Sequence, residues 1–239
     1  MDNFLRRLKY YGLGFGIGLI FVIFFFQNRG CSWFPENRVK NVILRNVLVV
    51  NNEGEKQMQK LGLVDSTLVQ AINLGDVDFP ASDKKSTSKI YYFNCKTNSG
   101  KSFNCHVSLN ETSFISEVIF SKSPSNKVKI SKEGYGKFIH FPVKKDFVYL
   151  DSTEIDECKL VNWPFSNENQ VLQSIMTNGK LNFATSQLEL KPRPLQVIEF
   201  QDKKSRPITV NAIWYKEKIQ IVKIDLGYEN ECDKEKRLE

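Results

Sequence analysis

The side chains that could do chemistry in this chain are few, and the cysteines are the most distinctive of them. Cys95 and Cys105 flank the turn sequence TNSGK, so a tight hairpin would place them on neighbouring strands. Opposed Cβ atoms in a hairpin lie about 4.5 to 5.5 Å apart, and a disulfide prefers about 3.5 to 4.5 Å. The spacing favours a disulfide in an oxidising compartment, with two reduced core cysteines as the alternative. Cys158 and Cys232 are a second candidate pair, which would leave Cys31 free or linked to another chain.

The histidines and aspartates offer little else. His106 adjoins Cys105, but neighbouring side chains on a strand point to opposite faces, so the two cannot form a dyad. His140 lies in the apolar sequence KFIHFP and is typical of a packed histidine. Asp76 and Asp78 in GDVDF could share one face of a strand, where we expect a solvated edge. Without a CxxC, a His-x-x-x-His or a glycine-rich phosphate loop, we predict no catalytic, cofactor-binding or metal-binding residues.

Periodicity and turn signals indicate the elements that carry these residues. We expect a strand at 42–50, a short helix at 54–61 closed by Gly62, a helix from Asp65 or Ser66 to Leu74 stopped by Gly75, two strands within 90–109, and a closing strand at 114–120. The first unit is therefore a strand, two helices and a small antiparallel sheet.

One phrase of this unit occurs twice. LVQAINLGDVDFPAS at 68–82 resembles LQSIMTNGKLNFATS at 172–186, with Leu, Ile or Met, Gly, Phe and Ser matching at one offset. Asp76 becomes Lys180 and Asp78 becomes Asn182, so the apolar positions repeat and the charges do not. This pattern favours a duplicated fold over a duplicated active site, with chance similarity as the alternative. Upstream of the second copy, the segment 128–151 is typical of strands, and we expect these strands to replace the first helix.

These signals predict an α+β fold with an N-terminal transmembrane helix and two small domains. Each domain would pack one or two short helices on a three- to four-stranded antiparallel sheet. The predicted boundaries are a cytoplasmic tail at 1–9, a transmembrane anchor at 10–28, a tether at 29–41, domains at 42–121 and 127–228, and a charged tail at 229–239.

The anchor prediction rests on the uncharged run YYGLGFGIGLIFVIFFFQN, since about 20 largely apolar residues are needed to cross a bilayer. A cleaved signal peptide and a buried helix are the alternatives. Gly12, Gly14, Gly16 and Gly18 form two small-xxx-small pairs that favour helix packing in lipid, although glycine is also common in such helices. We expect a single-pass protein of the bacterial inner membrane, with most of the chain on the periplasmic side.

The anchor, the sequence GCSWFPENRVKN, the phrase LVQAINLGDVDFPAS and a later Asn-Cys together resemble a bacterial family of membrane-anchored proteins that carry a domain of unknown function, number 4258. The resemblance covers residues 1 to about 120. Broader relatives of that domain are similar to small ribonuclease toxins, which would place a His and an Arg on the first helix. That helix reads EGEKQMQKL here, so the resemblance implies no catalytic residue.

Two classes of function follow. Of the net charge of +7, residues 1–30 carry +3, which is the highest imbalance per residue, and residues 31–121 are nearly neutral at +1, which gives no support to nucleic acid binding. We expect a non-enzymatic, membrane-anchored interaction protein or accessory subunit of a membrane complex, with the membrane and other subunits as partners and no cofactor, nucleic acid or small-molecule substrate. The alternative is a degenerate ribonuclease-like module that binds RNA or acts as an enzyme.

Overall fold

The computed structural model describes residues 2–29, 34–86, 88–110, 112–121, 128–142, 147–215 and 218–227; the side chains of 2–5 and 24–29 lie outside this description. The chain divides into two compact units, Met1–Val42 and Ile43–Glu239. The predicted charged tail at 229–239 lies outside the described residues.

The N-terminal segment is helical. α1 (Asp2–Arg29) and α2 (Pro35–Leu44) are both helices. Pro35 is the first residue of α2, a position where the missing N–H has no helical partner to lose. The predicted tether at 29–41 is therefore helical from Pro35 onward, and the strand predicted at 42–50 begins later, at Val47.

The predicted transmembrane anchor at 10–28 is contradicted. Across the residues that the structure describes, no helix is long and apolar enough to cross a membrane. The predictions of a cytoplasmic tail, a single-pass inner-membrane location and a periplasmic body fall with the anchor.

The first half of the second unit runs through two helices and five strands. In chain order these are β1 (Val47–Asn51), α3 (Asn52–Leu61), α4 (Asp65–Leu74), β2 (Asp76–Asp83), β3 (Lys89–Lys96), β4 (Ser102–Leu109) and β5 (Ile115–Phe120). β2 to β5 pair antiparallel in sequence order, and β1 returns to pair parallel with β5. This half matches the predicted strand, two helices and antiparallel sheet, with β2 and the parallel pairing as additions.

The second half repeats this order. After β6 (Tyr135–His140) come β7 (Val148–Leu150), α5 (Glu157–Val161), α6 (Glu168–Asn178), β8 (Lys180–Asn182), β9 (Gln196–Gln201), β10 (Pro207–Tyr215) and β11 (Lys218–Asp225). β8 to β11 pair antiparallel in sequence order, and β7 pairs parallel with β11. The first helix of the second copy is therefore present as α5, contrary to the prediction that strands replace it.

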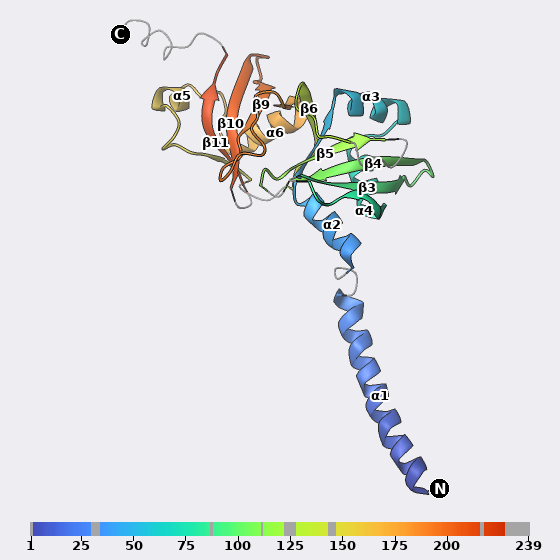
Figure 1. Cartoon of the computed structure of the whole chain (residues 1–239). Coiled ribbons are helices and arrows are strands. Elements are labelled where there is room, and N and C mark those ends of the chain that lie inside the picture. The colour runs from blue at the N-terminus through green and yellow to red at the C-terminus, as the bar shows by residue number, and fades with distance from the viewer. Residues whose placement is uncertain are drawn as a thin grey trace, which may run out of the picture. The chain divides into compact units, whose positions relative to one another are not determined.

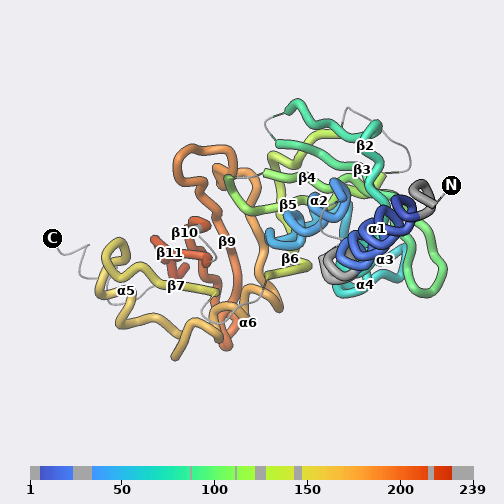
Figure 2. The backbone as a smooth tube through the Cα atoms, turned by 90° about the horizontal axis from the view of Figure 1, so that it is seen from below, coloured from blue at the N-terminus to red at the C-terminus, as the bar shows by residue number. Residues whose placement is uncertain are grey.

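The two halves share one sheet. The described strands form an 11-stranded mixed sheet in the order β2-β3-β4-β5-β1-β6-β8-β9-β10-β11-β7. β6 pairs antiparallel with both β1 and β8, and so joins the halves (Figures 1 and 2). The predicted architecture of two separate domains with three- to four-stranded antiparallel sheets is wrong, because β6 supplies a pairing that no local sequence signal indicated.

The helices of the two halves pack on opposite faces of this sheet. A Cβ at Gly54 of α3 would lie 3.2 Å from the Val50 side chain. Val49, whose side chain points to the other face, belongs to the buried cluster that contains Val171 and Ile175 of α6. One strand, β6, lies between the two halves, and it reverses the strand directions of the second half relative to those of the first. The helices of the second half therefore pack on the other face of the sheet.

The repeated phrase marks the same corner in both halves. α4 ends at Leu74 before Gly75, and α6 ends at Asn178 before Gly179, and both glycines have extended backbone. A Cβ would lie 2.8 Å from the Ala71 carbonyl oxygen at Gly75 and 2.4 Å from that of Ile175 at Gly179. Glycine is therefore required in both copies by a close approach of backbone to backbone.

The turn after this corner is also shared. Asp78 Oδ1 accepts a hydrogen bond from Ala81 N at 3.1 Å, and Asn182 Oδ1 accepts one from Thr185 N at 3.2 Å. Asp and Asn offer the same acceptor oxygen to such a turn. Asp78 of GDVDF therefore has a structural role in the turn, and Asn182 fills the same role in the second half, which supports the duplicated fold.

Candidate functional site

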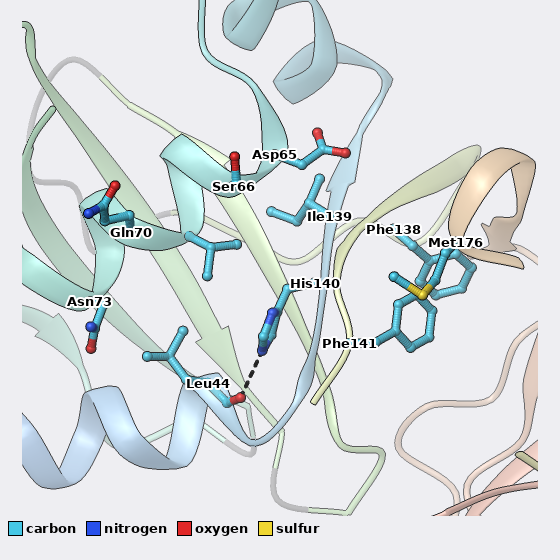
Figure 3. A pocket seen from close by; sticks show the side chains of 11 residues that line it. Leu44, Asp65, Ser66, Gln70, Asn73, Phe138, Ile139, His140, Phe141 and Met176 are labelled. Atoms are coloured by element: carbon cyan, nitrogen blue, oxygen red, sulfur yellow. Dashed lines mark hydrogen bonds between the residues drawn. The ribbon is translucent and has the colours of Figure 1, made fainter. Parts of the chain in front are cut away.

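The junction between the halves contains a pocket of about 620 Å³. α4, β6, Leu44 and Met176 of α6 form its walls, and we call it the junction pocket. It is lined by Leu44, Asp65, Ser66, Val69, Gln70, Asn73, Phe138, Ile139, His140, Phe141 and Met176. Figure 3 shows the side chains of α4 on one side of His140 and Phe138, Phe141 and Met176 on the other.

The α4 wall follows from helical spacing. Leu68, Ala71 and Ile72 face the core and are buried. Ser66, Gln70 and Asn73 are exposed and recur at intervals of four and three residues, which places them on one side of the helix. This side offers hydroxyl and amide groups, which are uncharged donors and acceptors.

The opposite wall is apolar. Phe138 and Phe141 are buried, with ring centroids 5.0 Å apart. Met176 is 47% exposed and lines the same pocket. The repeated phrase matches Met176 with Ile72, but Ile72 is fully buried, whereas the buried residues of α6 are Val171, Leu172 and Ile175. This large exposed side chain is therefore available to a ligand.

The ionisable groups of the pocket already have partners. His140 Nε2 lies 3.0 Å from the Leu44 carbonyl oxygen. A carbonyl can only accept, so this contact places a hydrogen on Nε2. Asp65 accepts from Lys137 Nζ at 2.9 Å, with both side chains more than a third exposed. The sequence treated His140 as a packed histidine, and its place beside a pocket was missed.

Cys95 and Cys105 lie away from this pocket, in the buried part of the first half. Both are free thiols with sulfurs 3.9 Å apart. Cys95 pairs across the hairpin with Phe103, and Cys105 pairs with Phe93. The cysteines are therefore diagonal neighbours rather than opposed residues, so the geometry assumed for the disulfide is wrong. A bridge between them stays a prediction.

The equivalent positions in the second half explain these cysteines as core residues. The hairpin pairing Cys95 with Phe103 corresponds to the pairing of Phe200 with Ile208, which makes Val210 the counterpart of Cys105. Phe200 and Val210 are buried. The hydrogen bond with Cys95 and full burial raise the pKa of the Cys105 thiol well above its usual range, which opposes formation of a reactive thiolate.

Other predicted residues have structural surroundings. His106 is 1% exposed and its ring centroid lies 4.9 Å from that of Tyr92. A Cβ at Gly12, Gly14, Gly16 or Gly18 would meet nothing within 4 Å, and their role in helix packing stays a prediction. Cys158 is disulfide-bonded, while the suggested partner Cys232 and Cys31 lie outside the described residues. Among the described side chains, no group of three or more His, Cys, Asp or Glu is placed to hold a metal ion.

The carboxylate of Glu117 is buried. Glu117 of β5 is 2% exposed and accepts hydrogen bonds from Asn51 Nδ2 at 3.0 Å, Ser131 Oγ at 2.6 Å and Ser131 N at 2.7 Å. Burial raises the pKa of Glu117, although these bonds oppose the shift. In the second half, Gln220 Nε2 of β11 donates to Asp151 at the end of β7. Asn51 at the end of β1 and Glu117 of β5 thus correspond to Asp151 and Gln220, with the amide and the carboxylate exchanged between the two strands. This correspondence indicates that Glu117 has a structural role.

Comparison with known proteins adds no assignment. No protein family, no curated protein and no solved structure matches the chain. The resemblance to the family with the domain of unknown function stays a prediction.

Proposed function

We propose that this chain is a non-enzymatic interaction protein that holds a segment of a partner polypeptide in the junction pocket. The observation that carries the proposal is the composition of the pocket walls. An exposed methionine and buried aromatic rings line the pocket on one side of His140, and the hydroxyl and amide groups of α4 line it on the other (Figure 3). Binding sites commonly combine apolar walls with a few polar groups that fix orientation.

The chemistry of the pocket suits a polypeptide. Amide side chains such as Gln70 and Asn73 can both donate to and accept from a peptide backbone. Met176 is unbranched and polarisable, so it adapts to apolar side chains of different shape. Asp65 and His140 are held by Lys137 and by a backbone carbonyl, so they contribute orientation and polarity.

Two substitutions with equal exposure test this proposal. Met176 and Leu190 are each 47% exposed, and only Met176 lines the junction pocket. In affinity purification with the tagged full chain, Met176→Asp should reduce recovery of a partner at least about tenfold, because a buried carboxylate in an apolar contact is unfavourable. Leu190→Asp should retain the partner.

The same experiment can reject the proposal. Equal recovery by both variants would remove the junction pocket from recognition. Recovery of RNA in place of a protein, sensitive to ribonuclease, would favour the ribonuclease-like alternative. Circular dichroism of both variants provides the control for folding.

A further inference from the structure

The two halves contain equivalent parallel edge strands, β1 and β7. Val47 N donates to the carbonyl oxygen of Phe114, the residue before β5, at 2.9 Å. Because backbone amides alternate in direction along a strand, those of Leu48 and Val50 face away from β5. In β7, Ile219 N donates to Phe147 O at 2.7 Å and Asp151 N donates to Ile221 O at 2.9 Å. The amides of Val148 and Leu150 therefore face away from β11. Leu150 corresponds to Val50.

The edge of β1 is covered by β6. Val50 pairs with Lys137 of β6 in antiparallel register. The Lys137 side chain reaches Asp65, the first residue of α4, with Nζ 2.9 Å from Oδ1. The strand that covers this edge is thus held by backbone pairing and by one ion pair to the start of the neighbouring helix.

β7 is the last strand of the described sheet, so its outer edge pairs with no other described strand. Its outward amide at Leu150 donates to Glu168 Oε1 at 3.3 Å, and Glu168 is the first residue of α6. Both helices therefore begin with an acidic residue beside an outward-facing strand. In the first half, Asp65 binds Lys137 of the covering strand β6. In the second half, Glu168 accepts the hydrogen bond from the Leu150 amide that a carbonyl of a covering strand would otherwise accept.

We propose that the outer edge of β7 is a docking site for an extended, lysine-containing segment of a partner polypeptide. The segment pairs antiparallel with β7, as β6 pairs with β1. Its backbone carbonyl replaces Glu168 as the acceptor for the Leu150 amide. The released Glu168 carboxylate binds the lysine of the segment, as Asp65 binds Lys137. Strand addition to an open edge is a general mode of peptide recognition.

This site is separate from the junction pocket. Glu168 and Leu150 are not among the pocket residues. Loss of binding at one site therefore leaves the other to be measured, and the two proposals can fail independently.

A peptide with the sequence of residues 133–141 is a suitable probe, because it contains the strand that covers the equivalent edge. Fluorescence anisotropy with the full chain should show binding of this peptide. A peptide with Lys137→Glu should bind at least about tenfold more weakly. Hydrogen exchange of the Val148 and Leu150 amides should slow when the first peptide is bound.

Variants of the full chain identify the edge that is used. Glu168→Lys should weaken binding of the lysine peptide about tenfold and restore binding of the Lys137→Glu peptide, which distinguishes a charge contact from misfolding. Asp65→Lys is the matched control, because a peptide that displaced β6 from β1 would depend on Asp65. Sensitivity to Asp65→Lys alone, protection confined to β1, or equal binding of both peptides would overturn the proposal.

Discussion

Gly179→Ala should destabilise the second unit through the corner between α6 and β8. The added Cβ would lie 2.4 Å from the carbonyl oxygen and 2.7 Å from the Cα of Ile175. Both atoms belong to the backbone of the last helical turn, where Gly179 N donates to Ile175 O at 2.8 Å. Relief of the clash must therefore move the end of α6 and the buried Ile175 side chain.

The expected cost can be estimated from overpacking. Extra methyl groups in a close-packed site typically cost about 1 to 3 kcal/mol. The unfolded-state effect of Gly→Ala offsets about 0.4 to 1 kcal/mol. Since the contact is with backbone rather than with a flexible side chain, we expect a net loss of about 2 kcal/mol. Gly75→Ala should cost less, because its closest contact is 2.8 Å.

Urea unfolding followed by tryptophan fluorescence measures this loss, since Trp163 and Trp214 both lie in the second half. Gly16→Ala is the control, because a Cβ there would meet nothing within 4 Å. A Gly179→Ala protein as stable as wild type would refute the steric reason for the glycine and weaken the interpretation of the repeated phrase as a packing corner.

Three further predictions concern single side chains. Cys105→Val, which introduces the counterpart residue Val210, should change the free energy of unfolding by less than about 1.5 kcal/mol in urea denaturation; a larger loss would indicate a role beyond packing. Asp78→Asn, which introduces the counterpart residue Asn182, should be close to neutral in the same assay, whereas Asp78→Ala should cost about 1 kcal/mol through the lost turn hydrogen bond; equal losses would contradict the turn assignment. Burial raises the pKa of Glu117 in the folded chain, so the contribution of this group to the free energy of unfolding is greatest below the ordinary glutamate range of about pH 4 to 5 and is lost as the pH rises through the raised pKa. Glu117→Gln should remove this part of the pH dependence of stability. An unchanged dependence of stability on pH would show that the Glu117 carboxyl does not titrate as described.

Local signals predicted much of the first half. The helix that ends before Gly75, the hairpin around TNSGK and the closing strand all occur in the structure. Helix periodicity, glycine stops and β-branched strands act over a few residues, so one sequence is enough to find them. The start of α2 at Pro35 was missed, because proline both ends and starts helices.

The arrangement of the halves depends on contacts that are distant in sequence. β6 is adjacent to β1, more than eighty residues before it, and this pairing turns two sheets into one. The junction pocket has the same origin, because α4, β6 and α6 come from separate segments. The spacing of Ser66, Gln70 and Asn73 was the one local signal for this wall, since a row of uncharged polar groups on a helix indicates an exposed face.

The central claim is that a partner polypeptide occupies the junction pocket, and site-specific photocrosslinking tests it most directly. A benzoylphenylalanine placed at Met176 should form a covalent adduct with the partner, whereas the same residue placed at the equally exposed Leu190 should not. Adducts that form equally from both positions, or from Leu190 alone, would contradict the claim.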